Sequence, residues 1–424
     1  MSSKTSALAS RLLFIDSLRA IAAIYVVMHH AMINFYDPVV EHMSDFSEFK
    51  LSGIRSLIIK FFYQGHYAVD LFIVLSGFSL MLSVIKYDYQ LKDGLLLFLK
   101  RRAIRILPTY YAAIILSLVL IFTLIGDTTQ THWDRSLPVN VFDVVTHFLL
   151  IHDFFNSTVL KINHVFWSIV VECRIYLFFP LLLWLWHKSG ALLALSFSLI
   201  VSVLGFIVLV MLNKFLSDDL NMESSGISPY ILLFTFGMLA ADLAFKKGKT
   251  QERIRALYKQ RSLLFIISGL IIAGVIIGLG KTLVNMDNPG IFDYEVLYSH
   301  LKDISIGFLC AIFLFATTLL AIDQKRTSLL MKVLNWQPLV FIGTFSYSLY
   351  LVHPLALQVI TKFIIIPMHY DRFTSAIVLT IMGTGASIVV GYLFFLGFEL
   401  PFLKLGQRGK IKPIEQETVI NPAA

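Results

Sequence analysis

Ten apolar segments, each long enough to cross a bilayer, set what this chain can fold into. A membrane helix takes about 20 mostly apolar residues, because about 30 Å of hydrocarbon is crossed at about 1.5 Å per residue. Only 15% of the 424 residues are charged, against about 25% in soluble domains, so little aqueous domain is left. We predict an all-α, polytopic bundle with spans near 14–35, 66–86, 106–126, 166–187, 190–213, 228–246, 262–280, 301–321, 338–361 and 374–400.

Basic residues in the loops orient these spans. Clusters of lysine and arginine follow the second, sixth, eighth and tenth spans, whereas the loops after the third, fifth and seventh spans hold only one or two. Basic residues accumulate on the cytoplasmic side of membrane proteins. We therefore predict that both termini are cytoplasmic and that residues 1–402 form one transmembrane domain, followed by a polar tail over 403–424. The same bias explains the net charge of +8 without a nucleic acid partner.

Two predicted outward loops, 36–65 and 127–165, are longer than helix connections usually are. The second contains the apolar run Val139 to Phe155, for which we predict a short interfacial or re-entrant helix. The only cysteines, Cys173 and Cys310, both lie inside predicted spans, so neither a disulfide framework nor a cysteine metal site is supported. We predict no metal site.

The first span carries ionisable residues, which is the strongest sign of function. An ionisable group at the bilayer centre costs roughly 2.5–3.5 kcal/mol on insertion scales, so such groups are usually kept for function. Arg19 and His30 are eleven residues apart, which places them within about 20° of the same helix face and about 16 Å apart along the axis. The spacing indicates a substrate path from Arg19 at the cytoplasmic boundary to His30 at mid-membrane.

Polar residues of other spans reach a similar depth once the spans are oriented. Glu172 in the fourth span and His353 in the ninth are expected to converge with His30 in a pocket suited to acid–base chemistry. The side chains that we expect to bind substrate around this pocket are Asp70, Ser76, Trp167, Ser168 and Tyr350. A structural reading also exists: Glu172 can pair with Arg174, buried histidines can bridge helices, and Asp70 can cap a helix.

Before the third span, a basic cluster lies on the predicted cytoplasmic face. Arg101, Arg102 and Arg105 stand there together with Lys100. Guanidinium groups bind phosphate oxygens in bidentate fashion, so the cluster can clamp a polyphosphate. The plainer interpretation is that these residues only set the topology.

Five segments, in this order, resemble those of membrane acyltransferase family 3. That family's signature in the first helix is Arg or Lys, ten residues, then His, as at Arg19 and His30. The other four segments run from Ala68 to Phe78, from Arg101 to Pro108, from Phe166 through the Trp-Ser-x-x-x-Glu motif to Pro180, and from Phe345 to His353. The chain departs from the family pattern at Ala68, where Gly is usual, and at Cys173-Arg174, where other polar residues are usual.

The resemblance implies that an acyl group, usually acetyl, passes from cytoplasmic acyl-CoA to a hydroxyl on the other side of the membrane. Acetyl-CoA would be the donor substrate and not a permanently bound cofactor. The acceptor would be a carbohydrate such as lipopolysaccharide O-antigen, exopolysaccharide or another surface glycan, and the location a bacterial inner membrane. In this family-based assignment His30 acts as general base or carries the acyl group, Glu172 or His353 orients it, and the acyl-CoA is held by Arg19, Arg101, Arg102 and Arg105.

Other functions stay open at this stage. A transporter or flippase of lipid-linked sugars also has many spans and buried charges, but the repeated halves common in transporters are not visible here. A membrane glycosyltransferase would be expected to keep its catalytic groups in large outward loops. An acyltransferase acting on a non-carbohydrate small molecule fits the same residues. The sequence does not indicate the oligomeric state.

Overall fold

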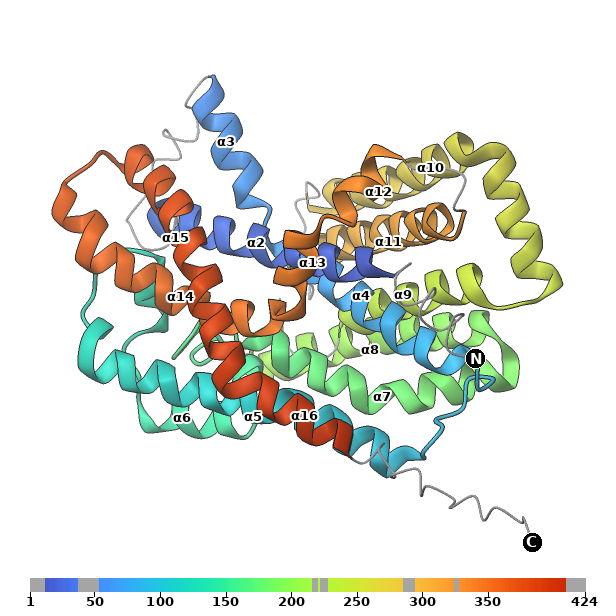
Figure 1. Cartoon of the computed structure of the whole chain (residues 1–424), viewed down its shortest axis with the longest axis horizontal. Coiled ribbons are helices and arrows are strands. Elements are labelled where there is room, and N and C mark those ends of the chain that lie inside the picture. The colour runs from blue at the N-terminus through green and yellow to red at the C-terminus, as the bar shows by residue number, and fades with distance from the viewer. Residues whose placement is uncertain are drawn as a thin grey trace, which may run out of the picture.

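A computed structural model describes residues 12–36, 53–215, 220–221, 228–284, 294–323 and 328–408. Over these residues the chain is helical, apart from loops and one isolated bridge between Phe155 and Leu220. Figure 1 shows the helices gathered around α2 and α4. The main helices are α2 (Leu13–Tyr36), α3 (Ile54–Tyr63), α4 (His66–Ile85), α5 (Leu95–Leu120), α7 (Trp167–Ser189), α8 (Ala191–Phe215), α9 (Tyr230–Phe245), α10 (Lys249–Val284), α11 (Tyr294–Ile322), α12 (Leu329–Leu334), α13 (Gln337–Thr344), α14 (Ser346–Ile360), α15 (Arg372–Phe394) and α16 (Leu400–Arg408).

Nine helical segments within the described residues are long and apolar enough to cross a membrane. This confirms the predicted all-α, polytopic class. Four of these segments join consecutive elements, and three of the four are α3 with α4, α5 with the π-helical turn η2 (Ile121–Ile125), and α15 with the turn η7 (Phe395–Glu399) and α16. The ninth predicted span is α14, extended by the turns η5 (Thr361–Ile365) and η6 (Ile366–Met368). The side of the membrane on which the termini lie stays a prediction.

The sixth predicted span, 228–246, is shorter than expected. Its helix, α9, has 16 residues, which is about 24 Å and less than the hydrocarbon thickness of about 30 Å. Most of α9 is buried by neighbouring helices. The helix at this position is therefore shorter than the predicted span, because its apolar residues serve contacts inside the protein.

Two glycines let α4 and α9 pack backbone against backbone. A Cβ atom added at Gly77 would lie 2.0 Å from the carbonyl oxygen of Phe234, and one added at Gly237 would lie 2.0 Å from that of Val74. Small residues permit such close approach between membrane helices. Gly77 therefore serves helix packing, and it fixes the position of the neighbouring Ser76.

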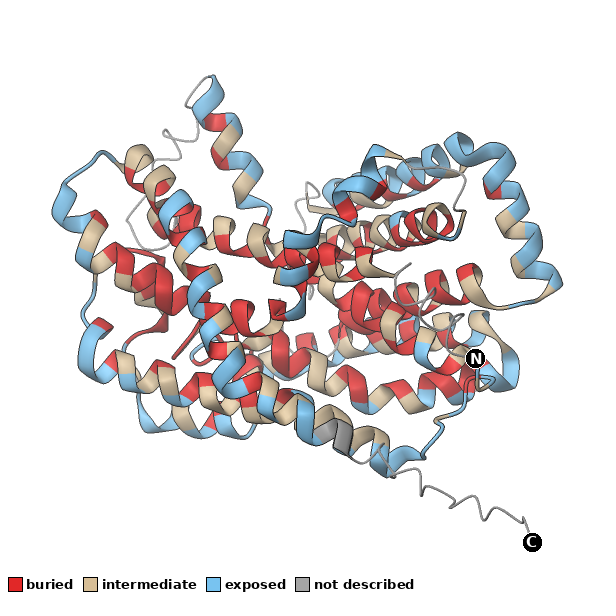
Figure 2. Ribbon diagram, in the orientation of Figure 1, coloured by how far each residue is buried: buried red, intermediate tan, exposed pale blue. Residues whose placement is uncertain are grey.

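The long helix α10 lies at the edge of the bundle, on the right in Figure 1, and much of its surface is exposed in Figure 2. Its backbone is kinked at Arg261, where φ is −136° and ψ is 42°. Beyond the kink, large apolar side chains point outward, among them Leu263, Leu264, Ile271, Val275 and Leu279. Because a contiguous apolar surface of this kind is stable only against lipid or another protein, it supports a membrane location.

The loop over 127–165 is folded. It contains η3 (His132–Ser136), α6 (Val141–Phe148) and η4 (His152–Phe154). The start of α6 has a capping box. The backbone N–H of Asp143 donates to Asn140 Oδ1 at 3.0 Å, and the backbone N–H of Asn140 donates to Asp143 Oδ2 at 2.8 Å. This confirms the short helix predicted for the loop. Most of the other long loop, 37–52, and the tail residues 409–424 lie outside the described residues.

Candidate functional site

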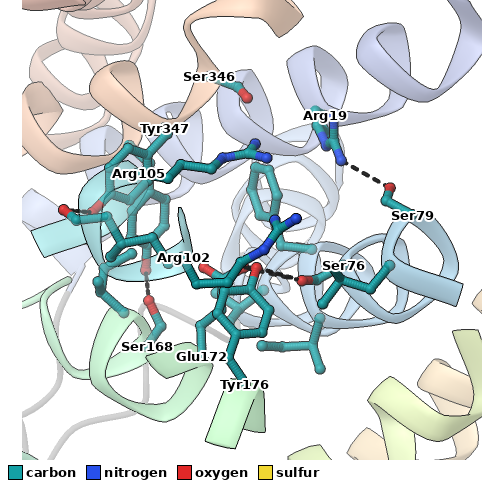
Figure 3. Close-up of a pocket in the computed structure, with 17 residues that line it drawn as sticks. Arg19, Ser76, Ser79, Arg102, Arg105, Ser168, Glu172, Tyr176, Ser346 and Tyr347 are labelled. Carbon is teal, nitrogen blue, oxygen red and sulfur yellow. Dashed lines mark hydrogen bonds between the residues drawn. The ribbon is translucent and has the colours of Figure 1, made fainter. Parts of the chain in front are cut away.

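A pocket between α2, α4, α5, α7 and α14 brings together most of the predicted polar residues (Figure 3). Its volume is about 110 Å³. We call it the arginine pocket. Its polar lining residues are Arg19, Ser76, Ser79, Arg102, Arg105, Ser168, Glu172, Tyr176, Ser346, Tyr347 and Tyr350.

Three guanidinium groups line the arginine pocket. Arg19 donates to Ser79 Oγ at 2.9 Å and to Asp16 Oδ1 at 3.1 Å. The Arg102 guanidinium lies 5.7 Å from the centre of the Tyr176 ring, and its Nε is buried without a hydrogen-bond partner among the described residues. Arg105 is exposed. Three cations on one pocket suit a ligand that carries phosphates.

Arg101, the fourth predicted donor-binding residue, is not among the residues lining this pocket. Its guanidinium forms an ion pair with Asp93, which lies just before α5. This pairing gives Arg101 a local structural role and separates it from Arg102 and Arg105.

Glu172 lines the same pocket as the three arginines. It accepts hydrogen bonds from Ser76 Oγ at 3.1 Å and from the Tyr176 hydroxyl, and the two donor oxygens are 2.8 Å apart. The sequence predicted that Glu172 converges with His30 and His353. In the structure, the pocket residue that contacts His353 is Tyr350 and not Glu172.

Arg174 does not pair with Glu172, although the two are close in sequence. Its Nη2 donates to Asp153 Oδ1 at 2.7 Å and to the Leu150 carbonyl at 2.9 Å. The guanidinium carbon lies 4.1 Å from the centre of the Phe154 ring. Arg174 thus anchors the folded loop to α7, which leaves the carboxylate of Glu172 in the arginine pocket.

The structure brings His30 and His353 into direct contact. His30 Nδ1 lies 3.0 Å from His353 Nε2 and 3.1 Å from the Val26 carbonyl oxygen, and His353 Nδ1 lies 2.7 Å from the Tyr350 carbonyl oxygen. These partners assign the neutral tautomers. His353 must donate from Nδ1, so its Nε2 is an acceptor, and His30 must then donate from Nδ1. The basic nitrogen of His30 is therefore Nε2.

Two further histidines, from the folded loop, complete this cluster. The ring centre of His164 lies 4.7 Å from that of His30 and 4.6 Å from that of His132. Burial, together with the nearby His132, holds the pKa of His164 well below its usual range, so His164 is neutral near pH 7. Sequence reasoning missed both residues because they lie in a loop; four histidines in one long outward loop were the available signal.

Tyr350 connects the arginine pocket to the histidines. Its hydroxyl lies 2.7 Å from Ser168 Oγ, its ring lines the pocket, and its ring centre is 5.8 Å from that of His353. Ser76, Ser168 and Tyr350 therefore line the arginine pocket, and their contact with substrate stays a prediction.

Trp167 and Asp70 lie elsewhere. Trp167 stacks on His66, with ring centres 6.0 Å apart and ring planes at 14°, and lines a second cavity of about 580 Å³. Asp70 is fully buried, next to His66 and Asp303. The predicted substrate-binding residues are thus divided between two places.

A protein-family model described as an acyltransferase domain matches residues 12–396. The chain is also 26% identical over 357 residues to the O-acetyltransferase OatA of Staphylococcus aureus, in strains NCTC 8325 / PS 47, COL and MRSA252. This alignment covers 80% of the chain and 49% of the relative, so the chain spans about half the length of the curated relatives it matches. No solved structure matches the chain.

Proposed function

The chain belongs to the membrane acyltransferase family whose model covers residues 12–396, and from this premise we propose that it transfers an acetyl group from acetyl-CoA to a hydroxyl of a cell-surface carbohydrate. The observation that carries the proposal is the chain of contacts, through Tyr350 and His353, from a pocket with three arginines to His30 and its assigned basic nitrogen. The first element suits a phosphate-bearing donor, and the second suits removal of a hydroxyl proton. The name of the S. aureus relative adds support for acetyl as the transferred group.

In this proposal the donor binds through its phosphates. Arg102 and the exposed Arg105 hold the phosphate oxygens of acetyl-CoA, with Arg19 deeper in the same pocket. The thioester arm then extends toward Tyr350. With the predicted orientation, the donor enters from the cytoplasm of a bacterial cell, and the acceptor reaches the histidines from the other side of the inner membrane.

His30 Nε2 accepts the proton of the acceptor hydroxyl while the hydroxyl oxygen attacks the thioester carbonyl. The new C–O bond forms, the C–S bond breaks, and the CoA thiolate leaves and takes up the proton. The imidazolium formed on His30 is stabilised through Nδ1–H by His353 Nε2 and the Val26 carbonyl. A route through an acyl group on His30 differs only in which nucleophile attacks first.

Transfer of labelled acetyl from acetyl-CoA in isolated membranes tests this assignment. His30→Gln should reduce transfer by about 10²- to 10⁴-fold, the usual contribution of a general base. His187→Gln is the matched control, because His187 is an exposed histidine at the far end of α7. Full transfer by His30→Gln at normal expression would rule out the proposed role, and absence of transfer by the unmodified chain would favour a transporter.

The acceptor class needs a separate measurement. Mass spectrometry of surface glycans from cells with and without the gene should show a difference of one acetyl group per modified sugar. Unchanged glycans, with labelled acetyl recovered in a small molecule, would instead favour a non-carbohydrate acceptor.

A further inference from the structure

His66 and Asp70 of α4 and Asp303 of α11 form a cluster outside the arginine pocket. One potential ligand atom from each side chain lies within 4.8 Å of the other two. His66 Nε2 is 3.3 Å from Asp303 Oδ1. His66 and Asp70 are one helical turn apart on one face of α4, and α11 packs against that helix. We call these three residues the α4–α11 cluster.

Three of the four carboxylate oxygens of this cluster are buried without a hydrogen-bond donor among the described residues. Asp70 is 0% exposed and Asp303 is 2% exposed. Neither oxygen of Asp70, nor Oδ1 of Asp303, accepts a hydrogen bond from any described residue. A buried carboxylate without donors loses several kcal/mol of solvation, and a second carboxylate beside it adds repulsion. A bound cation, or a proton shared by the two groups, removes both costs.

We propose that the α4–α11 cluster binds a divalent transition-metal cation, Zn²⁺ or Mn²⁺. One imidazole and two carboxylates are ligands that these ions accept, and two negative charges match one divalent cation. Three protein ligands leave at least one coordination position open. His66 and Asp303 both line the cavity of about 580 Å³ that contains Trp167, so the open position faces that cavity and can take an oxygen ligand from it.

The sequence did not reveal this site because its third ligand is far away along the chain. His66 and Asp70 stand near the start of the second predicted span, where a polar residue can simply cap the helix. Asp303 stands in a different apolar span. Only the packing of α11 on α4 brings the carboxylates together.

Metal content of the purified full-length chain in detergent tests the proposal. The protein is treated with chelator, incubated with Zn²⁺ or Mn²⁺, desalted and analysed by inductively coupled plasma mass spectrometry. We expect about one ion per chain, and a rise in the unfolding temperature with metal concentration. Both readouts are independent of acetyl transfer, so the metal site and the proposed function can fail separately.

The decisive variant is Asp303→Asn, which removes a charge and keeps the side-chain shape. It should weaken metal binding by more than about tenfold. Asp323→Asn is the matched control, because Asp323 lies just past the end of α11 and pairs with Lys259 at 3.7 Å. If Asp303→Asn does not yield folded protein, His66→Gln serves the same purpose. Undiminished binding in the folded variant, or absence of binding by the unmodified chain, overturns the proposal; the latter result would favour a shared proton.

Discussion

At the scale of single residues, the chemistry depends on which nitrogen carries each proton. His353 presents an unprotonated Nε2 only because its Nδ1 donates to the Tyr350 carbonyl. The unprotonated Nε2 of His353 in turn fixes the proton of His30 on Nδ1. Neither histidine has a carboxylate as its hydrogen-bond partner in these contacts. The orienting group for the proposed base is thus a second imidazole.

His353→Gln should therefore impair catalysis without weakening donor binding. The glutamine loses the defined acceptor for His30 Nδ1–H, so we expect kcat to fall by roughly 10²-fold while KM for acetyl-CoA changes little. Steady-state kinetics in membranes measures both constants. A parallel rise in KM would indicate that His353 only supports the fold of the pocket.

Arg101 and Arg102 are neighbours in sequence, so the effects of replacing each on KM for acetyl-CoA can be compared directly. Arg102→Ala should raise KM for acetyl-CoA by about 10- to 100-fold, since a charge-assisted hydrogen bond contributes about 1.5–3 kcal/mol. Arg101→Ala should leave KM nearly unchanged, because Arg101 pairs with Asp93 and is not among the pocket residues. Equal effects of the two substitutions would contradict the placement of the donor.

We expect acid to destabilise the protein through a buried histidine outside the spans. Burial lowers the pKa of His147, which stacks on His152 at a ring distance of 3.7 Å, to about 4. An unfolded histidine titrates near 6.5, so between these values the unfolded chain holds more protons. The free energy of unfolding therefore falls as the pH falls from 6.5 to 4, by up to about 1.4 kcal/mol per pH unit for this group.

His147→Gln should flatten this pH dependence. Unfolding temperatures of the purified protein between pH 7.5 and 4.5 measure the slope, and His187→Gln, at an exposed position, should leave the slope unchanged. A slope that is identical in all three proteins would show that other groups govern acid unfolding.

At the scale of elements, the contact between α4 and α9 matters most for the site. α4 carries Ser76 and His66, and its backbone meets that of α9 at two glycines. This contact has no room for a side chain, so it fixes the distance between the two helices. Residues on α4 thereby reach both the arginine pocket and the α4–α11 cluster.

Gly237→Ala should destabilise the protein by about 1–3 kcal/mol, since the added methyl would stand 2.0 Å from the Val74 carbonyl oxygen. Gly274→Ala on α10 is the control: nothing lies within 4 Å of its added Cβ, and alanine favours a helix by about 1 kcal/mol over glycine. Thermal unfolding in detergent should therefore move in opposite directions. A neutral Gly237→Ala would mean that the helices can separate without cost.

At the scale of the whole molecule, the sequence predicted what depends on local pattern. Apolar runs of sufficient length predicted nine of the ten spans, and one continuous helix, α2, carries both Arg19 and His30 as predicted. The length of α9 was not predictable, because a helix enclosed by other helices need not cross the full bilayer. The partners of Arg101 and Arg174 were missed because each is an acidic residue in a flanking loop.

The folded loop over 127–165 has a consequence for how the candidate site is assembled. Its histidines meet His30 only after the loop has docked, and Arg174 holds that docked position through Asp153. The proposed histidine cluster is therefore complete only when this loop is packed against the transmembrane helices. Acid that charges the buried His147 of this loop would therefore also disturb the surroundings of His30.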